Sequence, residues 1–302
     1  MAILEEHVGD GRPTEAFGIW EQFTIRDGLS DMKIESLFED SAGVMWIGTH
    51  DRGVVRYDGY EFETFSRGDG IGGDGVFSIL QDLEGDMWFG TNTGITRYDG
   101  NSFEQIEIEQ ECSFLWASCV DDRGNLWFGL ERRPGRPAAV CRWDGKRAEV
   151  IEVGERTRRE GFSVHALIAD GEGGILCGGH GLYQLSGDRS SELAIDSSLY
   201  DVMELFLFGD GSILIVQLTG VLVAKQRETF ELEHLIVTGR FCGAARCPDN
   251  TYWLVETDGI VTHIGLDGSR FVRRISANLW RPVCIDHIGR LWLGTYGMGL
   301  LC

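Results

Sequence analysis

This sequence of 302 residues contains little proline and no C-x-x-C cysteine pair. It has five prolines against 42 glycines, and with a hydrophobic share of 43% this balance favours tight turns rather than disorder. None of the eight cysteines belongs to a C-x-x-C pair, so no metal-binding cysteine motif is visible. We expect these cysteines to be buried thiols in strands, which suit a reducing compartment.

Positive charge and long hydrophobic runs are also scarce. Lysine and arginine number 27 against 48 aspartates and glutamates, which gives a net charge of −21. A surface this acidic repels nucleic acid and anionic lipid, so we expect neither as a partner. The first residues show no signal peptide, and no run reaches the roughly 18 apolar residues of a membrane span. We therefore predict a cytoplasmic protein, or a periplasmic one if an upstream targeting segment was removed.

What the sequence contains in abundance is one repeated motif. The stretch GVMWIGT at 43–49 returns as GDMWFGT at 85–91, and weaker copies begin at 124 and 289. We call the tryptophan of this motif, or the leucine that replaces it, the anchor of its repeat. The anchors follow one another at intervals near 40 residues and are Trp46, Trp88, Trp127, Leu176, Leu214, Trp253 and Trp292. Such a period is typical of β-propeller blades.

Each repeat reads as four short strands rich in β-branched and aromatic residues. The first two strands are joined by DSAG, DLEG, DDRG or DHIG in the best copies. These turns place Asp and Gly where a type I turn favours them. We predict an all-β fold, a seven-bladed β-propeller of four-stranded antiparallel blades over residues 17–302, with an N-terminal tail at 1–16. The anchor tryptophan is expected to pack between neighbouring blades.

The seventh repeat stops after its third strand, and the N-terminal region offers a replacement. GIWEQFT at 18–24 aligns with the fourth strands YEFETFS at 60–66 and NSFEQIE at 101–107. We therefore predict that the N-terminal strand pairs with the last blade and closes the ring. The longest interval between anchors contains a basic segment, 132–159, with nine Arg or Lys residues. We expect it to be a long solvated loop.

The repeat D-x-x-G-x-L/M-W-x-G-T-x-x-G-x-x-R-Y-D-G resembles the two-component regulator propeller repeat. The resemblance covers residues 17–302, strongly in the first, second and seventh units, partially in the third and weakly in the fourth to sixth. That family typically builds sensor domains of bacterial hybrid histidine kinases. The resemblance implies a non-catalytic sensor or scaffold module of the bacterial signalling type, which binds a ligand or a protein.

No catalytic motif is visible. H-E-x-x-H, G-x-S-x-G and P-loop patterns do not occur, so we predict no catalytic residue, no metal site and no cofactor. One alternative is a metal-dependent enzyme similar to streptogramin lyase. That lyase is also a seven-bladed propeller, and it uses a histidine and a metal-binding carboxylate at its channel mouth. A purely structural interaction platform is the other alternative.

The innermost strand of each blade is expected to be the first one, and it defines the candidate site. Residues twelve before the anchor are all apolar, and those ten before it are mostly small. Residues eleven before it share no chemical character, which is typical of a recognition ring; they are Glu35, Phe77, Trp116, His165, Met203, Cys242 and Arg281. The turns between second and third strands add His50, Asn92, Glu131, His180 and Tyr296.

From these two sets we predict ligand binding at the top mouth of the central channel, because mouths of ring-shaped folds are concave. The predicted ligand-binding residues are Glu35, Phe77, Trp116, His165, Met203, Arg281, His50, Asn92, His180 and Tyr296. Arg281 and Glu35 lie in adjacent blades, where they either pair or present opposite charges to a zwitterionic or polar ligand. The expected partner is a small polar molecule or a protein, and the chain is expected to be a monomer.

Overall fold

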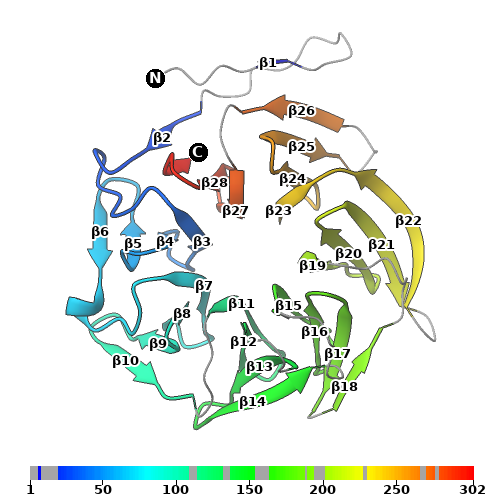
Figure 1. Cartoon of the computed structure of the whole chain (residues 1–302), viewed down its shortest axis with the longest axis horizontal. Helices are drawn as coiled ribbons and strands as arrows, with labels where there is room; N and C mark the ends of the chain where they lie inside the picture. Colours follow the sequence, from blue (N-terminus) through cyan, green and yellow to red (C-terminus); the bar gives the residue numbers. More distant parts are fainter. Residues whose placement is uncertain are drawn as a thin grey trace.

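The chain folds into seven antiparallel sheets arranged as the blades of a propeller around a central channel (Figure 1). This computed structural model describes residues 6–7, 20–108, 114–131, 137–153, 163–187, 189–193, 201–226, 230–265, 270–275 and 279–302. Of residues 6–7, 225–226, 230–237 and 280–281 it describes the backbone only. Six sheets have four strands and one has five, which confirms the predicted fold class.

The first strand of each blade lines the channel, and each contacts the first strand of the next blade around the ring (Figure 1). These strands are β3 (Ile34–Glu39), β7 (Val76–Gln81), β11 (Leu115–Val120), β15 (Ala166–Ala169), β19 (Val202–Leu207), β23 (Phe241–Arg246) and β27 (Leu279–Ile285). The second strands carry the repeated motif and are β4 (Met45–Thr49), β8 (Met87–Thr91), β12 (Leu126–Leu130), β16 (Ile175–Gly178), β20 (Ser212–Gln217), β24 (Tyr252–Glu256) and β28 (Leu291–Thr295). The expected strand order from the channel outward is confirmed.

The third and fourth strands form the outer part of each blade. The third strands are β5 (Val54–Tyr57), β9 (Ile95–Tyr98), β13 (Ala138–Trp143), β17 (Leu182–Ser186), β21 (Gly220–Gln226), β25 (Ile260–Ile264) and β29 (Leu300–Leu301). The fourth strands of the first six blades are β6 (Phe62–Phe65), β10 (Phe103–Ile106), β14 (Ala148–Val153), β18 (Arg189–Glu192), β22 (Phe230–Thr238) and β26 (Arg270–Arg274). A single short 3₁₀ helix, η1 (Arg67–Asp69), occurs among the described residues.

The N-terminal region contributes strands to two sheets. In the seventh sheet β2 (Gln22–Phe23) pairs antiparallel with β29, so that this sheet combines a strand from the N-terminal region with the last three strands of the chain. In the sixth sheet the two-residue strand β1 (Glu6–His7) pairs with β26 and makes it five-stranded. β1 lies within the segment 1–16 that the sequence predicts as a tail.

The basic segment 132–159 is not a single loop, contrary to the sequence-based expectation. Its described residues form the antiparallel pair β13 and β14 of the third blade. The reason is the apolar content of the segment, since Ala139, Val140 and Cys141 are fully buried against the second strand. Residues 132–136 and 154–162 lie outside the described residues.

The core lies between blades, and the anchor residues are central to it. Trp46 of the first blade packs with Val76 and Phe89 of the second in one buried cluster. Trp292 of the seventh blade packs in the same way against Ile34 of the first. The prediction that the anchor tryptophan fills the space between neighbouring blades is therefore confirmed for these pairs.

A glycine two residues after the anchor lets adjacent blades approach. A Cβ on Gly48 would lie 2.0 Å from Ser36 Oγ and 2.4 Å from the carbonyl oxygen of Val76 in the next blade. No side chain fits in that space. Ser36 Oγ uses the closeness to donate a hydrogen bond of 2.9 Å to the same carbonyl oxygen. The motif thus needs this glycine for contact between blades rather than for an unusual backbone angle.

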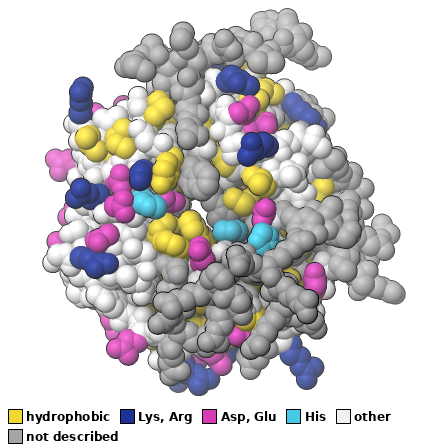
Figure 2. Space-filling model, viewed as in Figure 1, with side chains coloured by type: hydrophobic (Ala, Val, Ile, Leu, Met, Phe, Trp, Pro, Cys, Tyr) yellow, Lys and Arg dark blue, Asp and Glu magenta, His cyan; other side chains and the backbone are white. Residues whose placement is uncertain are grey.

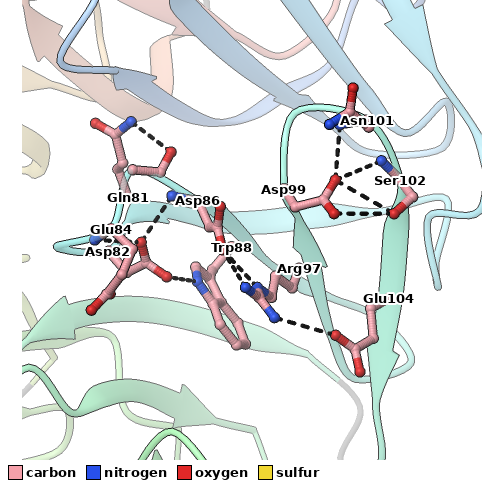
Figure 3. A network of polar contacts seen from close by, with 11 residues as sticks. Gln81, Asp82, Glu84, Asp86, Trp88, Arg97, Asp99, Asn101, Ser102 and Glu104 are labelled. Atoms are coloured by element: carbon pink, nitrogen blue, oxygen red, sulfur yellow. Dashed lines mark hydrogen bonds and ion pairs between the residues drawn. The ribbon is translucent and has the colours of Figure 1, made fainter.

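The aspartate turns lie between the first and second strands, and in four blades the turn aspartate accepts a hydrogen bond from the indole of the anchor tryptophan. In the second blade Asp82 accepts hydrogen bonds from the backbone N–H of Glu84 and Asp86 (Figure 3). Its second oxygen accepts a bond of 2.6 Å from Nε1 of Trp88. Gly85 completes the turn with a φ of 97°, which a side chain would oppose. The turn and the tryptophan, six residues apart, therefore form one structural unit.

The cysteine prediction holds for three thiols. Cys141, Cys177 and Cys242 are buried in strands, and burial raises the pKa of the Cys177 thiol well above its ordinary value. Cys284 is half-buried, and desolvation raises the pKa of its thiol to about 12. Such thiols carry little thiolate at neutral pH and are poor nucleophiles. Within the described residues, no helix has the length and apolar character needed to cross a membrane.

Candidate functional site at the channel mouth

A bulge in the first strand places one residue outside the regular ladder in five of the seven blades. In the first blade Ile34 pairs with Thr49 and Ser36 pairs with Gly48, so Glu35 has no opposite residue. The same one-residue shift isolates Phe77, Trp116, Met203 and Cys242. Bulges redirect a side chain and are common beside binding sites. The position eleven before the anchor is therefore a structural position, although its residue types differ between blades.

In the fourth and seventh blades, the residue eleven before the anchor also lies outside the regular ladder, but without a one-residue bulge. β15 begins only at Ala166, and His165 precedes it with its backbone N–H bonded to the carbonyl oxygen of Gly178. In β27 the register is broken between Leu279 and Val283, the stretch that contains Arg281. The Arg281 side chain lies outside the described residues, so its predicted pairing with Glu35 stays a prediction.

The channel contains a cavity of about 360 Å³. Four of the predicted recognition residues line it, namely Glu35, Phe77, Trp116 and His165. In Figure 2, hydrophobic, acidic and histidine side chains lie along part of the rim of the central opening. The lining continues along the first strands through apolar residues such as Leu37, Ile79 and Leu167 to Arg246 and Ile285. Four of the residues selected from the sequence thus line the cavity, and their binding of a ligand stays a prediction.

Five rings from successive blades form a chain of edge contacts at the mouth, which we call the aromatic arc: Tyr296, His50, Phe77, Trp116 and His165. The ring centroids of Tyr296 and His50 are 6.1 Å apart, and those of His50 and Phe77 are 6.0 Å apart. Phe77 and Trp116 approach to 4.8 Å, and Trp116 and His165 to 5.8 Å. Tilted and edge-to-face pairs of this kind stabilise each other, and the arc links blades seven, one, two, three and four.

Two carboxylates are bonded to members of the arc. Glu35 Oε1 lies 2.6 Å from Nδ1 of His50, with the Glu35 side chain only 3% exposed. Glu131 Oε2 accepts a hydrogen bond of 2.6 Å from Nε1 of Trp116. Each carboxylate fixes the orientation of one ring and brings negative charge to the mouth.

Among the described side chains, the other predicted residues do not line this cavity. His180 pairs with Asp201 at 2.9 Å, and Met203 is half-buried. The Asn92 Oδ1 atom is buried and accepts no hydrogen bond from any described residue, and a Cβ on Gly73 would lie 2.2 Å from it. Tyr296 is 39% exposed, and the Lys33 ammonium lies 5.0 Å from its ring centroid.

Sequence reasoning missed Glu204, Phe114 and Lys33 at or near the mouth. Glu204 lines the cavity from the position ten before the anchor, where other blades have small or apolar residues. A charged residue at a position that is otherwise small or apolar was the sequence signal that could have identified Glu204 as a site residue. Phe114 contacts both Phe77 and Trp116, but it precedes β11 and follows no repeat pattern. Among the described residues, no group of three or more His, Cys, Asp or Glu could hold a metal ion.

Comparison with known protein families agrees with the repeat. Residues 28–51, which contain the first strand, the aspartate turn and the second strand of blade one, match the model of the two component regulator propeller. The chain carries a two component regulator propeller repeat. The predicted resemblance is thereby confirmed, and no curated protein matches the chain significantly.

Solved structures show the same fold at low sequence identity. The extracellular domain of a putative hybrid two component system from B. thetaiotaomicron is 17% identical, with a TM-score of 0.74; the match covers 93% of this chain and 41% of that one. A streptogramin B lyase is 10% identical with a TM-score of 0.72, covering 93% and 96%. Virginiamycin B lyase from Staphylococcus aureus is 12% identical with a TM-score of 0.72, covering 93% and 97%. At these identities the likeness concerns the fold.

Proposed function

We propose that this propeller is a non-catalytic recognition module of the signalling type, whose ligand or protein partner binds at the top mouth of the channel. The observation that carries the proposal is the bulged position. It is built in the same way in several blades, yet it holds a carboxylate in one, aromatic rings in two and a thioether in another. A position kept only for packing would favour one chemical class. The position just before it does so, since it holds a buried apolar residue in each of these blades.

Two further observations support this function. The cavity behind the aromatic arc favours ligand recognition over a flat interaction platform, because concave sites bury more of a ligand. The repeat match and the similar extracellular domain of a two component system favour signalling. Those neighbours are extracellular domains, so they do not support the cytoplasmic location that the sequence predicts.

The proposal is tested with a ligand library and matched variants. Thermal shift would be recorded for the wild-type protein and for Trp116→Ala, which removes the central ring of the arc. We expect ligands that raise the melting temperature of the wild type and leave that of Trp116→Ala unchanged. Phe103→Ala is the control, because its half-buried ring lies in the outer strand β10. Ligands that stabilise Trp116→Ala as strongly as the wild type would place recognition elsewhere.

A lyase-type enzyme is the second candidate, favoured by one observation. His50 and Glu35 form a histidine–carboxylate pair at the mouth, an arrangement suited to a general base. One similar structure is a virginiamycin B lyase with quinupristin. Incubation of this protein with quinupristin and Mg²⁺, with His50→Ala as the control, tests the alternative. Turnover that His50→Ala abolishes would establish the enzyme and displace the recognition module.

A further inference from the structure

The aromatic arc presents ring faces and carboxylates together, and this combination favours a positively charged ligand group. We propose that the mouth binds the positively charged group of an organic cation, an ammonium or guanidinium on an aliphatic stem. This inference rests on the proposed function, since it names the ligand class of the same site. Cations are attracted to the faces of Trp, Tyr and Phe rings, and the attraction is stronger where water is partly excluded.

The carboxylates strengthen the attraction of the arc for cations. Glu131 accepts the indole N–H of Trp116 at 2.6 Å, so its negative charge lies at the edge of the central ring. Glu35 holds His50 in the same way from the neighbouring side of the arc. A cation over the Trp116 ring therefore meets both the ring quadrupole and nearby negative charge. A neutral sugar or aromatic ligand would lack the Coulombic attraction that a cation gains from that charge.

One ammonium of the chain already occupies such a position. The Lys33 Nζ atom lies 5.0 Å from the centroid of the Tyr296 ring, at the end of the arc. Lys33 is one of three lysines in the whole chain, so this contact is not a consequence of abundant lysine. It shows that the mouth accommodates an ammonium over an aromatic face.

The interior of the cavity has an apolar lining that suits the aliphatic stem of the proposed ligand. Leu37, Ile79 and Leu167 line it two residues along the first strands from Glu35, Phe77 and His165. Arg246 also lines this cavity, but together with Glu39 at the end of β3 and His287 in an aspartate turn it lines a second cavity. Arg246 therefore lies towards the face of the aspartate turns. The net charge of −21 adds long-range steering of cations to the protein.

The indole N–H signals of the tryptophans provide a direct test. The chain has nine tryptophans, and in ¹⁵N-tryptophan-labelled protein Trp116→Phe identifies the Trp116 signal by its loss. Titration with choline is compared with 3,3-dimethylbutan-1-ol, which has the same shape without the charge. We expect a saturable shift of the Trp116 signal with choline and about tenfold weaker binding of the neutral compound. Signals of Trp46, Trp88, Trp127 and Trp292, whose Nε1 atoms bond to aspartate turns, should not move.

A charge variant tests the contribution of the carboxylate. Glu131→Gln keeps an acceptor for the Trp116 indole but removes the negative charge, and we expect choline affinity to fall about threefold or more. Glu104→Gln is the matched control, because Glu104 is exposed in the outer strand β10. Its choline affinity should equal that of the wild type. Equal affinities of Glu131→Gln and wild type would overturn the role of the charge.

Further ligands show whether the cation is a free small molecule or a side chain of a partner protein. They also distinguish a failure of the cation inference from a failure of the proposed recognition at the mouth. If acetyl-Gly-Lys-Gly-amide binds more tightly than choline, the cation is a side chain of a partner protein; the reverse order indicates a free small molecule. A Trp116 shift with maltose or succinate, but with neither cation, would overturn this inference and leave mouth recognition intact. No shift with any of these compounds would overturn the inference and weaken the proposed function as well.

Discussion

Replacing Asp121 by asparagine tests whether the aspartate turn and the anchor are one unit. Asp121 is 6% exposed, and its Oδ1 accepts the backbone N–H groups of Arg123 and Asn125. Its Oδ2 accepts the indole N–H of Trp127 at 2.9 Å. Asparagine keeps the carbonyl oxygen for the turn but turns an NH₂ group towards that indole. A buried donor left without an acceptor costs about 1–3 kcal/mol, so we expect Asp121→Asn to lower the free energy of unfolding by that amount.

The pH dependence of this loss is a second signature. Burial raises the pKa of Asp121, but hydrogen bonds from Asn125 and Trp127 outweigh it and hold the pKa below its ordinary value of 3.8. A carboxyl with a lowered pKa stabilises the fold above its unfolded pKa, and this contribution is lost as the pH falls through the folded pKa. The difference in stability between wild type and Asp121→Asn should therefore be constant at neutral pH and shrink below about pH 4.

Urea denaturation followed by fluorescence measures both effects. Asp122→Asn is the control, because this neighbouring aspartate is exposed and its replacement should change stability by less than about 0.5 kcal/mol. In a Trp127→Phe background the indole donor is absent, so Asp121→Asn should cost less than in the wild type. If Asp121→Asn is as stable as Asp122→Asn, or costs the same with and without the indole, the coupling of turn and anchor is refuted.

Three other predictions follow from the same structure. Trp46→Ala should cost about 3–5 kcal/mol because Trp46 is buried between two blades, whereas Trp116→Ala should cost far less; equal losses in urea titrations would contradict this. Deletion of residues 1–24 removes β2 and should lower the melting temperature and promote association, because it exposes the edge of the last blade. An unchanged melting temperature and a clean monomer in size-exclusion chromatography would contradict this. Elemental analysis of protein purified without chelator should show no bound metal, and stoichiometric Ca, Mg or Zn would favour the lyase.

Much of the fold was predictable because the repeat encodes contacts that recur in the blades that keep the full motif. In GVMWIGT, Gly43 completes the turn, Trp46 fills the space between blades and Gly48 lets the next blade approach. Thr49 Oγ1 donates a hydrogen bond of 2.8 Å to the carbonyl oxygen of Gly53 and so closes the next turn. These contacts are local or join adjacent blades, and their sequence separation is therefore the same in each copy.

Contacts that do not repeat were not predictable. In the fourth blade Leu176 replaces the anchor tryptophan, and Asp170 instead accepts a bond of 2.9 Å from Gln184 of the third strand. No pattern based on the anchor could identify this compensation. At the mouth, the structure places Glu35 beside His50 of its own blade, a contact that the argument from blade order did not identify. The partner of a buried carboxylate depends on side-chain positions that differ by only a few ångströms, and the sequence does not specify these positions.

The two ends of the first strand are under different physical constraints, and this explains where function can reside. At the aspartate-turn end each residue pairs, caps a turn or holds a tryptophan, as Asp121 does with four hydrogen bonds, so a substitution there disturbs the fold. At the mouth end the bulge removes one residue from the ladder, and its side chain is needed neither for pairing nor for the turn. Glu35, Phe77 and Trp116 can therefore differ while the blades stay alike, and seven equivalent blades can build a mouth that is chemically asymmetric.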